Sequence, residues 1–480
     1  MKRKPILLRT ILLIVLATFI CGNLQSATLK SKSVASAGWA EIEITPPLGI
    51  ALGGRGAPST TSTKVLDPLF AQVLYLKDAR GTGFVLVSFD LIGMSHELSE
   101  KIRLKLVHEL GVPWNLVVLN CSHTHSGPYM IRDLMAGGGP APQIEIDYFK
   151  SLEEKIILAT RAAARTLTPV NVEVFAGTSE VAINRRGKNK QGNRGIIPDP
   201  DGPFDEKLWV MKLSPKNESA PAVIFSYACH PVIAYGFNYS AISADLPGVT
   251  RKVLREKLGE KVHTQFVQGL AGNVRPRVVA DLPNNRFRAA TSSDLQKAGT
   301  DLANDVLSAL KTKSQTLNLN IAGASDRPFM PRDEPPPRDF YEKMKTESEK
   351  TKNKFQLAAS AHWLACYDSG DGFAKGDAWP VGLIRLASDQ WIVHFAGEPC
   401  VEWRAKISEW LPGKNIVPWG YCQEGLAYLP TAEMLPEGGY EVLESNRLRI
   451  STPAQHAPGI NEAIRESLLR QLSFINADVN

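Results

Sequence analysis

Apolar and polar positions in the first quarter of the chain predict two strands with a helix between them. Residues 84–87 form an apolar run that ends shortly before Asp90, and residues 116–119 form a second run. Short apolar runs of this length are typical of buried strands. Between them, apolar residues recur every four positions until Gly111, as in an amphipathic helix. The apolar positions of this helix are Leu98, Ile102, Leu106 and Leu110.

The order strand, helix, strand predicts a βαβ unit, and later segments add to it. Parallel strands joined by a helix place their C-terminal ends at one edge of a sheet, where ligands bind in open α/β sheets. Further strands are predicted within 38–47, 172–183, 208–213, 223–227 and 391–395, and further helices at 149–159 and 295–306. We therefore predict an α/β fold with mixed sheets flanked by helices and a site at the C-terminal ends of the strands.

Two histidines, His123 and His125, stand where the apolar run 116–119 gives way to a Gly-Pro loop. If the extended conformation continues, both side chains point to one face, because strand side chains repeat every two residues. Two neighbouring imidazoles can form half of a metal site. The alternative is an exposed polar turn that contains two histidines by chance.

His230 and Glu398 also follow apolar runs, and together with His123 they can supply the nitrogen and oxygen ligands of a zinc site. Zinc would lower the pKa of a water, polarise a carbonyl and stabilise the oxyanion that forms. His125 would then orient the ligands or shuttle a proton. The alternatives are a histidine satisfied within the fold at position 230 and a plain turn at Glu398.

The N-terminus has the layout of a secretory signal peptide. Four of the basic residues behind the net charge of +6 precede an apolar run at residues 11–20. We expect a signal peptide over 1–27, with cleavage as late as residue 37, and export to the periplasm or the outside of the cell. Lipid anchoring at Cys21 is disfavoured by the bulky residue before it. We expect no transmembrane span in the mature chain and no nucleic-acid partner, because no basic stripe interleaves with aromatic residues.

The segment His-Thr-His-Ser-Gly-Pro at 123–128 resembles the Thr-His-Thr-His-Ser-Gly-Pro signature of neutral/alkaline (non-lysosomal) ceramidases, with Ser122 in place of the first threonine. Similar segments follow in the family's order, and the likeness spans roughly residues 38–441. They are Ile-Asn-Arg at 183–185, the strand ending in His230, Ala-Gly-Glu at 396–398, and tyrosine-containing stretches at 421–431 and 437–441.

In that family two histidines, a glutamate and a tyrosine hold the zinc. The resemblance therefore implies a ligand set for this chain, and it implies catalytic roles for His125 and Arg185 near the substrate's carbonyl and hydroxyl groups. Without the resemblance, Tyr428 would be a core residue with a hydrogen-bonded hydroxyl. The implied ligands are His123, His230, Glu398 and Tyr428.

One motif departs from the family. Ceramidases carry Gly-Asp-x-Ser-Pro-Asn, with an active-site serine, where residues 272–277 read Gly-Asn-Val-Arg-Pro-Arg. Arg275 thus replaces a small hydroxyl by a permanent cation, and Asn273 replaces the aspartate. Arg275 and Arg277 are candidate substrate-binding residues for a carboxylate or phosphate. The alternative is a solvated basic loop.

These observations predict an exported, zinc-dependent hydrolase that cleaves an amide, N-acyl bond of a small-molecule or lipid-derived substrate through metal-activated water. A second interpretation keeps the zinc but selects an anionic or sugar-derived amide or ester through Arg275 and Arg277. A third is a non-catalytic secreted binding protein. We expect one domain over 38–480 with a charged helical insertion at about 326–365, and no C-terminal immunoglobulin-like domain.

Overall fold

The predicted βαβ unit is present in the protein, whose structure is a computed structural model. The structure describes residues 34–477 except 55–59, 133–134, 136–137, 371, 447–448 and 450–452, so the predicted signal peptide lies outside the described residues. β4 (Gly83–Phe89) and β5 (Val117–Cys121) run parallel. Between them, α2 (His96–Leu110) begins at Ser95, whose side chain accepts from Leu98 N, and ends at Gly111 in the left-handed conformation.

These two strands belong to a nine-stranded mixed sheet. Its β4–β5 and β9–β11 pairs are parallel, and its other neighbouring pairs are antiparallel. From one edge to the other the strands are β11 (His263–Gln268), β9 (Ala222–Tyr227), β8 (Lys207–Pro215), β6 (Thr168–Thr178), β1 (Ser36–Glu43), β3 (Phe70–Lys77), β4 and β5, and β15 (Gln315–Thr316) pairs with β6.

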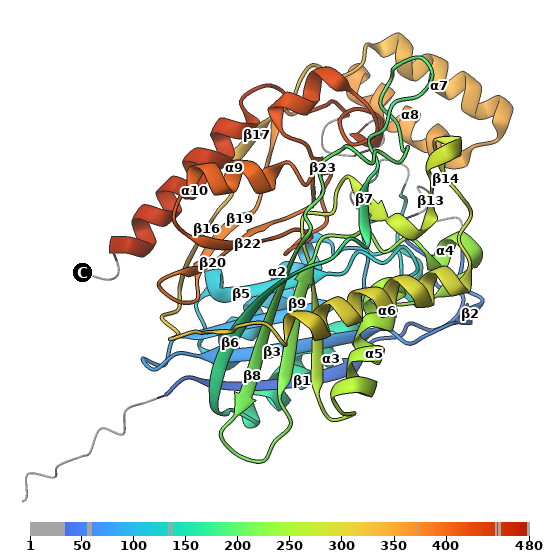
Figure 1. The fold of residues 1–480 in the computed structure, drawn as a ribbon. Helices are drawn as coiled ribbons and strands as arrows, with labels where there is room; N and C mark the ends of the chain where they lie inside the picture. Colours follow the sequence, from blue (N-terminus) through green and yellow to red (C-terminus); the bar gives the residue numbers. More distant parts are fainter. Residues whose placement is uncertain are drawn as a thin grey trace, which may run out of the picture. The chain divides into compact units, whose positions relative to one another are not determined.

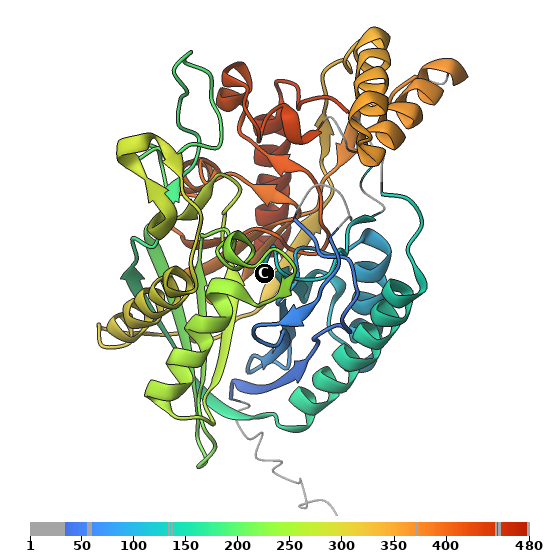
Figure 2. The same ribbon diagram turned by 90° about the vertical axis from the view of Figure 1, so that its right-hand side faces the viewer.

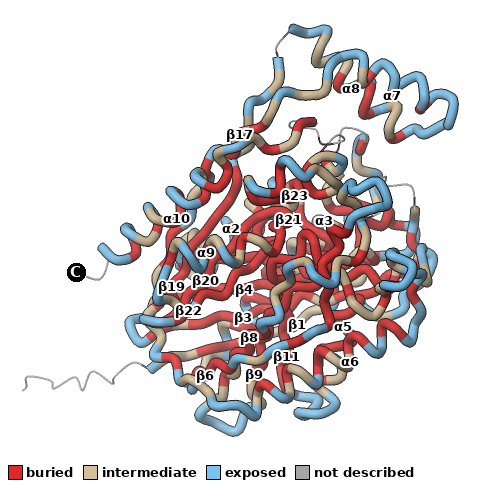
Figure 3. Tube along the Cα trace, turned by 45° about the horizontal axis from the view of Figure 1, so that its top comes forward, coloured by how far each residue is buried: buried red, intermediate tan, exposed pale blue. Residues whose placement is uncertain are grey.

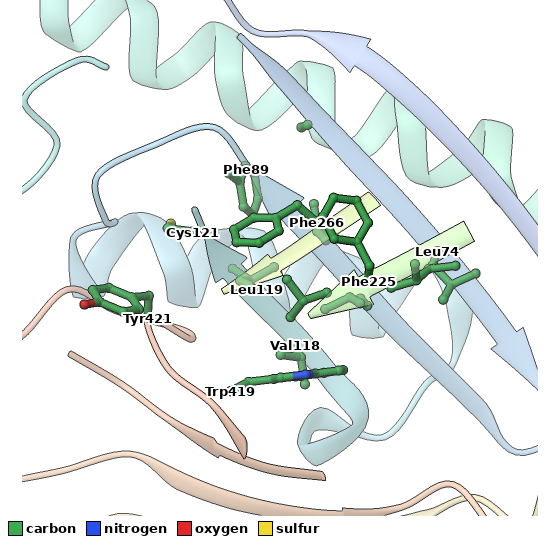
Figure 4. Close-up of a cluster of buried hydrophobic side chains, with 14 of the residues drawn as sticks. Leu74, Phe89, Val118, Leu119, Cys121, Phe225, Phe266, Trp419 and Tyr421 are labelled. Carbon is green, nitrogen blue, oxygen red and sulfur yellow. The ribbon is translucent and has the colours of Figure 1, made fainter. Parts of the chain in front are cut away.

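The two edges of this sheet come together. Gln268 N in β11 donates to Asn120 Oδ1 in β5 at 2.9 Å, although β11 and β5 lie at opposite ends of the strand order. The two halves of the sheet enclose one core, in which Leu119, Phe225 and Phe266 lie close together (Figure 4). Burying each ring stabilises the fold by about 1.5–3 kcal/mol. This curl brings the C-terminal ends of β5 and β11 side by side.

Helices flank the sheet, as predicted (Figures 1 and 2). α3 (Gln143–Arg165) packs on β1 and β3, α5 (Asp245–Leu258) packs on β11, and α6 (Ser292–Ala309) packs on β6 and β8. On α3 the buried residues include Leu152, Ile156 and Ala159, which recur at helical spacing, so one apolar face meets the sheet. The short α4 (Ala234–Phe237) follows β9.

A second sheet of four strands carries its own core. Its strands, in order, are β16 (Ala322–Asp326), β19 (Val381–Arg385), β20 (Gln390–Phe395) and β22 (Asn415–Trp419). α10 (Ile460–Ala477) packs on β16 and β19, and α9 (Trp403–Trp410) follows β20 and contacts α10. The buried rings of Trp379, Phe395 and Trp403 belong to this core. β20 ends three residues before Glu398, which is how this sheet reaches the site.

Short strand pairs and one helix pair complete the described fold. The pairs are β12 (Val274–Pro276) with β7 (Ala182–Asn184), β21 (Glu398–Pro399) with β23 (Tyr428–Leu429), β10 (Ala241–Ile242) with β2 (Lys64–Val65), β13 (Ala280–Asp281) with β14 (Arg286–Phe287), and β17 (Phe329–Pro331) with β18 (Gly376–Ala378). α7 (Arg338–Thr351) and α8 (Lys354–Ser369) pack on each other, and α7 is largely exposed (Figure 3). The two helices occupy much of the range where we predict an insertion. Among the described residues, no helix is long and apolar enough to cross a membrane.

Candidate metal centre

His123 lies just beyond β5, in a turn rather than in an extended strand. Its φ is 67°, in the left-handed region, so the extended conformation does not continue and strand periodicity does not relate His123 to His125. Backbone hydrogen bonds fix this turn: His123 N donates to Leu91 O at 2.8 Å. The imidazole Nδ1 lies 2.5 Å from Ile92 O. Because a carbonyl can only accept, Nδ1 carries the proton, and Nε2 presents a lone pair 3.2 Å from Glu398 Oε2.

His230 repeats this arrangement after β9. Its Nδ1 donates to Ala271 O at 2.9 Å, which leaves Nε2 as the lone-pair nitrogen. Among the described residues this buried Nε2 has no hydrogen-bond partner, and it lies 3.8 Å from Glu398 Oε2. Burial lowers the pKa of His230 well below its ordinary value, and the nearby Arg185 cation lowers it further. The imidazole is therefore neutral, which is the form that binds metals.

Gln268, the last residue of β11, joins the two histidine-bearing segments. Its side-chain amide donates to Ser122 O and to Cys229 O, both at 2.8 Å. These carbonyls belong to the residues immediately before His123 and His230. One buried side chain thus fixes the distance between the two turns that carry the imidazoles.

Glu398 reaches the same point from the second sheet. β21 pairs in parallel with β23, so that Glu398 lies opposite Tyr428. Glu398 accepts a hydrogen bond from Tyr428, and its Oε2 is buried without a hydrogen-bond partner among the described residues. Burial raises the pKa of Glu398, but a protonated His123 imidazole and the Tyr428 hydroxyl together outweigh burial and lower it overall. Burial and the Glu398 carboxylate raise the pKa of Tyr428 well above its ordinary value.

The atoms that converge here suit a metal ion. Nε2 of His123, Nε2 of His230 and Oε2 of Glu398 are all acceptors when the imidazoles are neutral, so they repel one another unless a cation lies between them. Ligands held at 2.0–2.2 Å in a tetrahedral zinc site lie roughly 3.3–3.6 Å apart. The separations of 3.2 and 3.8 Å from Glu398 bracket that range. The potential donor atoms of His123, His125 and His230 also lie within 4.8 Å of one another.

His125 borders the centre. Its ring centroid lies 5.0 Å from that of His123 and 5.1 Å from that of His230. Gly54 backs the ring so closely that a Cβ added there would overlap Nδ1. On its other side the ring lies 5.6 Å from that of Tyr235.

Arg185 lies against Tyr428 rather than in open space. Its guanidinium donates to the Tyr428 hydroxyl at 3.0 Å and to Glu441 at 2.8 Å, and all three side chains are buried. Glu441 also binds Arg186 at 3.0 Å, so two arginines share this carboxylate, and Arg186 pairs with Glu437 as well. The attraction of Tyr428 and Glu441 outweighs burial and raises the pKa of Arg185 well above its ordinary value.

The two arginines that replace polar residues of the ceramidase motif differ in their surroundings. Arg275 in β12 donates to the Tyr235 hydroxyl at 3.3 Å and stacks over Phe287, with its guanidinium carbon 4.6 Å from the ring centroid. Arg277 instead donates to Glu180 O at 3.0 Å and lies over Phe204. The guanidinium groups of Arg275 and Arg277 therefore contact different residues and do not line one common pocket.

Several residues of the centre were missed by sequence reasoning. Tyr421, with a φ of 54°, stacks on His123 at 4.4 Å between ring centroids, and Gln268 and Glu441 act through hydrogen bonds to distant segments. Two of these residues, Tyr421 and Glu441, lie in the tyrosine-containing stretches that resemble ceramidases, and that resemblance is the sequence signal that could have found them. Asp90, just beyond β4, forms a bidentate pair with Arg251, and Ser95 caps α2.

Comparison with known proteins identifies the class of fold. No protein-family model matches the sequence, and no curated protein matches it. The solved structure of neutral ceramidase from Pseudomonas aeruginosa is similar, with a TM-score of 0.67 over 90% of this chain and 73% of that chain, at 16% identity. A ceramidase complexed with C2 is similar to the same extent, covering 74% of that chain. The chain therefore has a ceramidase-like fold in a divergent sequence, as its motifs predicted.

Proposed function

We propose that the protein is a zinc-dependent hydrolase that cleaves the amide bond of an N-acylated, lipid-derived or small-molecule substrate. The observation that carries the proposal is the convergence of three buried acceptor atoms, from His123, His230 and Glu398, in a ceramidase-like fold. Such a cluster is costly without a cation, because buried acceptors need partners. Acceptors of this kind are the ligands that zinc takes in hydrolases.

In this proposal His123, His230, Glu398 and Tyr428 hold the ion. When bound, zinc supplies Lewis acidity, which lowers the pKa of water and polarises a carbonyl. Burial keeps His230 neutral, so its Nε2 lone pair is available to a cation at neutral pH. The hydrogen bonds from Nδ1 of both histidines to backbone carbonyls hold the imidazoles in the tautomer that binds through Nε2.

His125 and Arg185 have the catalytic roles. His125 lies beside both ligand histidines, so its imidazole is placed to pass a proton between water and the leaving amine. Arg185 adds a positive charge that favours negative charge developing on a substrate oxygen. Its bonds to Glu441 and Tyr428 keep the guanidinium fixed while the reaction proceeds.

The proposed setting is the periplasm or the cell exterior, on the evidence of the basic and apolar N-terminal residues. Secretion would be tested by N-terminal sequencing of the mature protein recovered from cells. Cleavage between residues 27 and 37 is expected, and an intact N-terminus on protein from the cytoplasm would contradict export.

Metal analysis combined with an amide panel tests the proposed activity. The wild-type protein should bind one zinc per chain and hydrolyse at least one N-acyl amide of a panel that includes ceramide. The variant His123→Ala should lose both properties while remaining folded by circular dichroism. Zinc at full occupancy without turnover of any amide or ester would instead favour a binding protein. Folded protein that binds no zinc would contradict the proposal.

A further inference from the structure

Arg275 is a cation close to the candidate centre without a carboxylate to balance it. Among the described residues no carboxylate forms an ion pair with its guanidinium, and its buried Nε has no hydrogen-bond partner. Arg185 and Arg186 share Glu441, in contrast. An arginine is always charged at neutral pH, so burying it without a counter-charge costs several kcal/mol.

Two contacts place this guanidinium beside the reacting groups. Its Nη2 donates to the Tyr235 hydroxyl at 3.3 Å, and the Tyr235 ring lies 5.6 Å from that of His125. The guanidinium carbon lies 4.6 Å from the centroid of the Phe287 ring, and Nε has no hydrogen-bond partner among the described residues. Burial lowers the pKa of Arg275, and the positive charge of Arg185 lowers it further.

The strand pairing explains how Arg275 is held there. β12 runs antiparallel to β7, with Val274 opposite Asn184 and Arg275 opposite Ile183. Arg185, the residue that follows β7, donates its backbone N–H to Asn273 O at 2.9 Å. The backbone segments that carry Arg185 and Arg275 are therefore joined to each other by main-chain hydrogen bonds.

From this geometry we infer that Arg275 is a specificity residue, which binds an anionic group, a carboxylate or sulfonate, lying near the scissile amide of the substrate. A guanidinium edge with free N–H groups binds such an anion in a bidentate manner. This inference rests on the proposed function for the position of the amide. It narrows the substrate class from N-acyl amides in general to those with a negative charge near the amide.

Equilibrium binding measures this selectivity without requiring turnover. Two matched pairs of probes place the charge on either side of the amide: N-lauroylglycine with N-lauroylglycinamide, and N-dodecylsuccinamic acid with its methyl ester. Calorimetry on the metal-free protein should show at least one charged probe binding about 10–100-fold more tightly than its neutral partner, the effect of one or two charge-assisted hydrogen bonds. Arg275→Met should remove this preference, and Arg275→Lys should keep part of it.

Arg286→Met is the matched control. Arg286 is an exposed arginine next to Phe287 and pairs with Asp281 at 3.2 Å, so its loss should leave the preference unchanged. Equal binding of charged and neutral probes by the wild type would overturn the inference, as would a preference that survives in a folded Arg275→Met protein. Hydrolysis of ceramide without charge selectivity would refute this inference alone. Charge-selective binding without hydrolysis of any amide would refute the proposed function alone.

Discussion

Gln268 offers a sharp test of how the fold builds the metal centre. We consider Gln268→Met, which keeps the length of the side chain and removes its amide. The carbonyls of Ser122 and Cys229 would lose their donors, both now at 2.8 Å. The Cys229 N–H, which donates to Gln268 Oε1 at 3.3 Å, would also lose its acceptor. Leaving a buried polar group unpaired costs about 1–3 kcal/mol, so these three losses should lower the free energy of unfolding by at least about 3 kcal/mol.

The same loss should weaken zinc binding, because the turns that carry His123 and His230 would lose the side chain that bonds to both of them and would keep the hydrogen bond from His125 N to Pro231 O at 3.2 Å. Loss of groups that orient metal ligands typically reduces metal affinity about 10–100-fold. Zinc affinity would be measured by competition with a chromophoric chelator, and the free energy of unfolding by urea denaturation of the metal-free protein.

Gln265→Met is the control for general destabilisation. Gln265 is also buried in β11, and its amide donates to Ser88 Oγ at 3.0 Å, away from the histidine turns. The Gln265→Met variant should lower the free energy of unfolding to a similar degree. Its zinc affinity should change less than about threefold, because neither turn that carries a metal ligand loses a hydrogen-bond partner. If both variants reduced zinc affinity equally, the positioning role of Gln268 would be refuted.

Three further predictions follow from individual contacts. Glu441→Gln should destabilise the protein by about 3–5 kcal/mol in urea denaturation, because Arg185 and Arg186 would lose their shared carboxylate; a change below 1 kcal/mol would contradict this. Gly54→Ala should reduce amide hydrolysis at least tenfold while zinc stays bound, because the added Cβ overlaps His125, and a normal rate would argue against a role for this histidine. Burial lowers the pKa of His263 to about 4 and of His394 to about 3. Between pH 7 and pH 5 both histidines therefore bind a proton in the unfolded state but stay neutral in the folded state, and each should lower the free energy of unfolding by about 2 kcal/mol. The free energy of unfolding should therefore drop with acidification, and His394→Gln should lessen the drop; an equal drop in that variant would contradict the assignment.

The sequence predicted the elements whose patterns are local. The helix that ends at Gly111, the strand before His123 and their parallel arrangement all follow from periodicity and a helix stop signal, and all are present. The ceramidase-like motifs predicted the fold as well. What joins the motifs to one another is not local, and pattern analysis cannot detect it.

The candidate site shows this limit clearly. Periodicity placed His123 in an extended strand, whereas hydrogen bonds to Leu91 and Ile92 hold it in a left-handed turn. Glu441 lies 256 positions from Arg185, and their buried pairing depends on tertiary packing. Arg275 and Arg277 are two residues apart and would share a face in a regular strand, but β12 ends at Pro276 and their side chains reach different partners.

Anomalous scattering at the zinc edge from crystals of the zinc-loaded protein tests the central claim most directly. We predict one strong peak per chain within about 2.0–2.3 Å of Nε2 of His123, Nε2 of His230 and the Glu398 carboxylate, with His125 outside the coordination sphere. A peak bound by His125 in place of Glu398, or a fully occupied ion elsewhere with this cluster empty, would contradict the account.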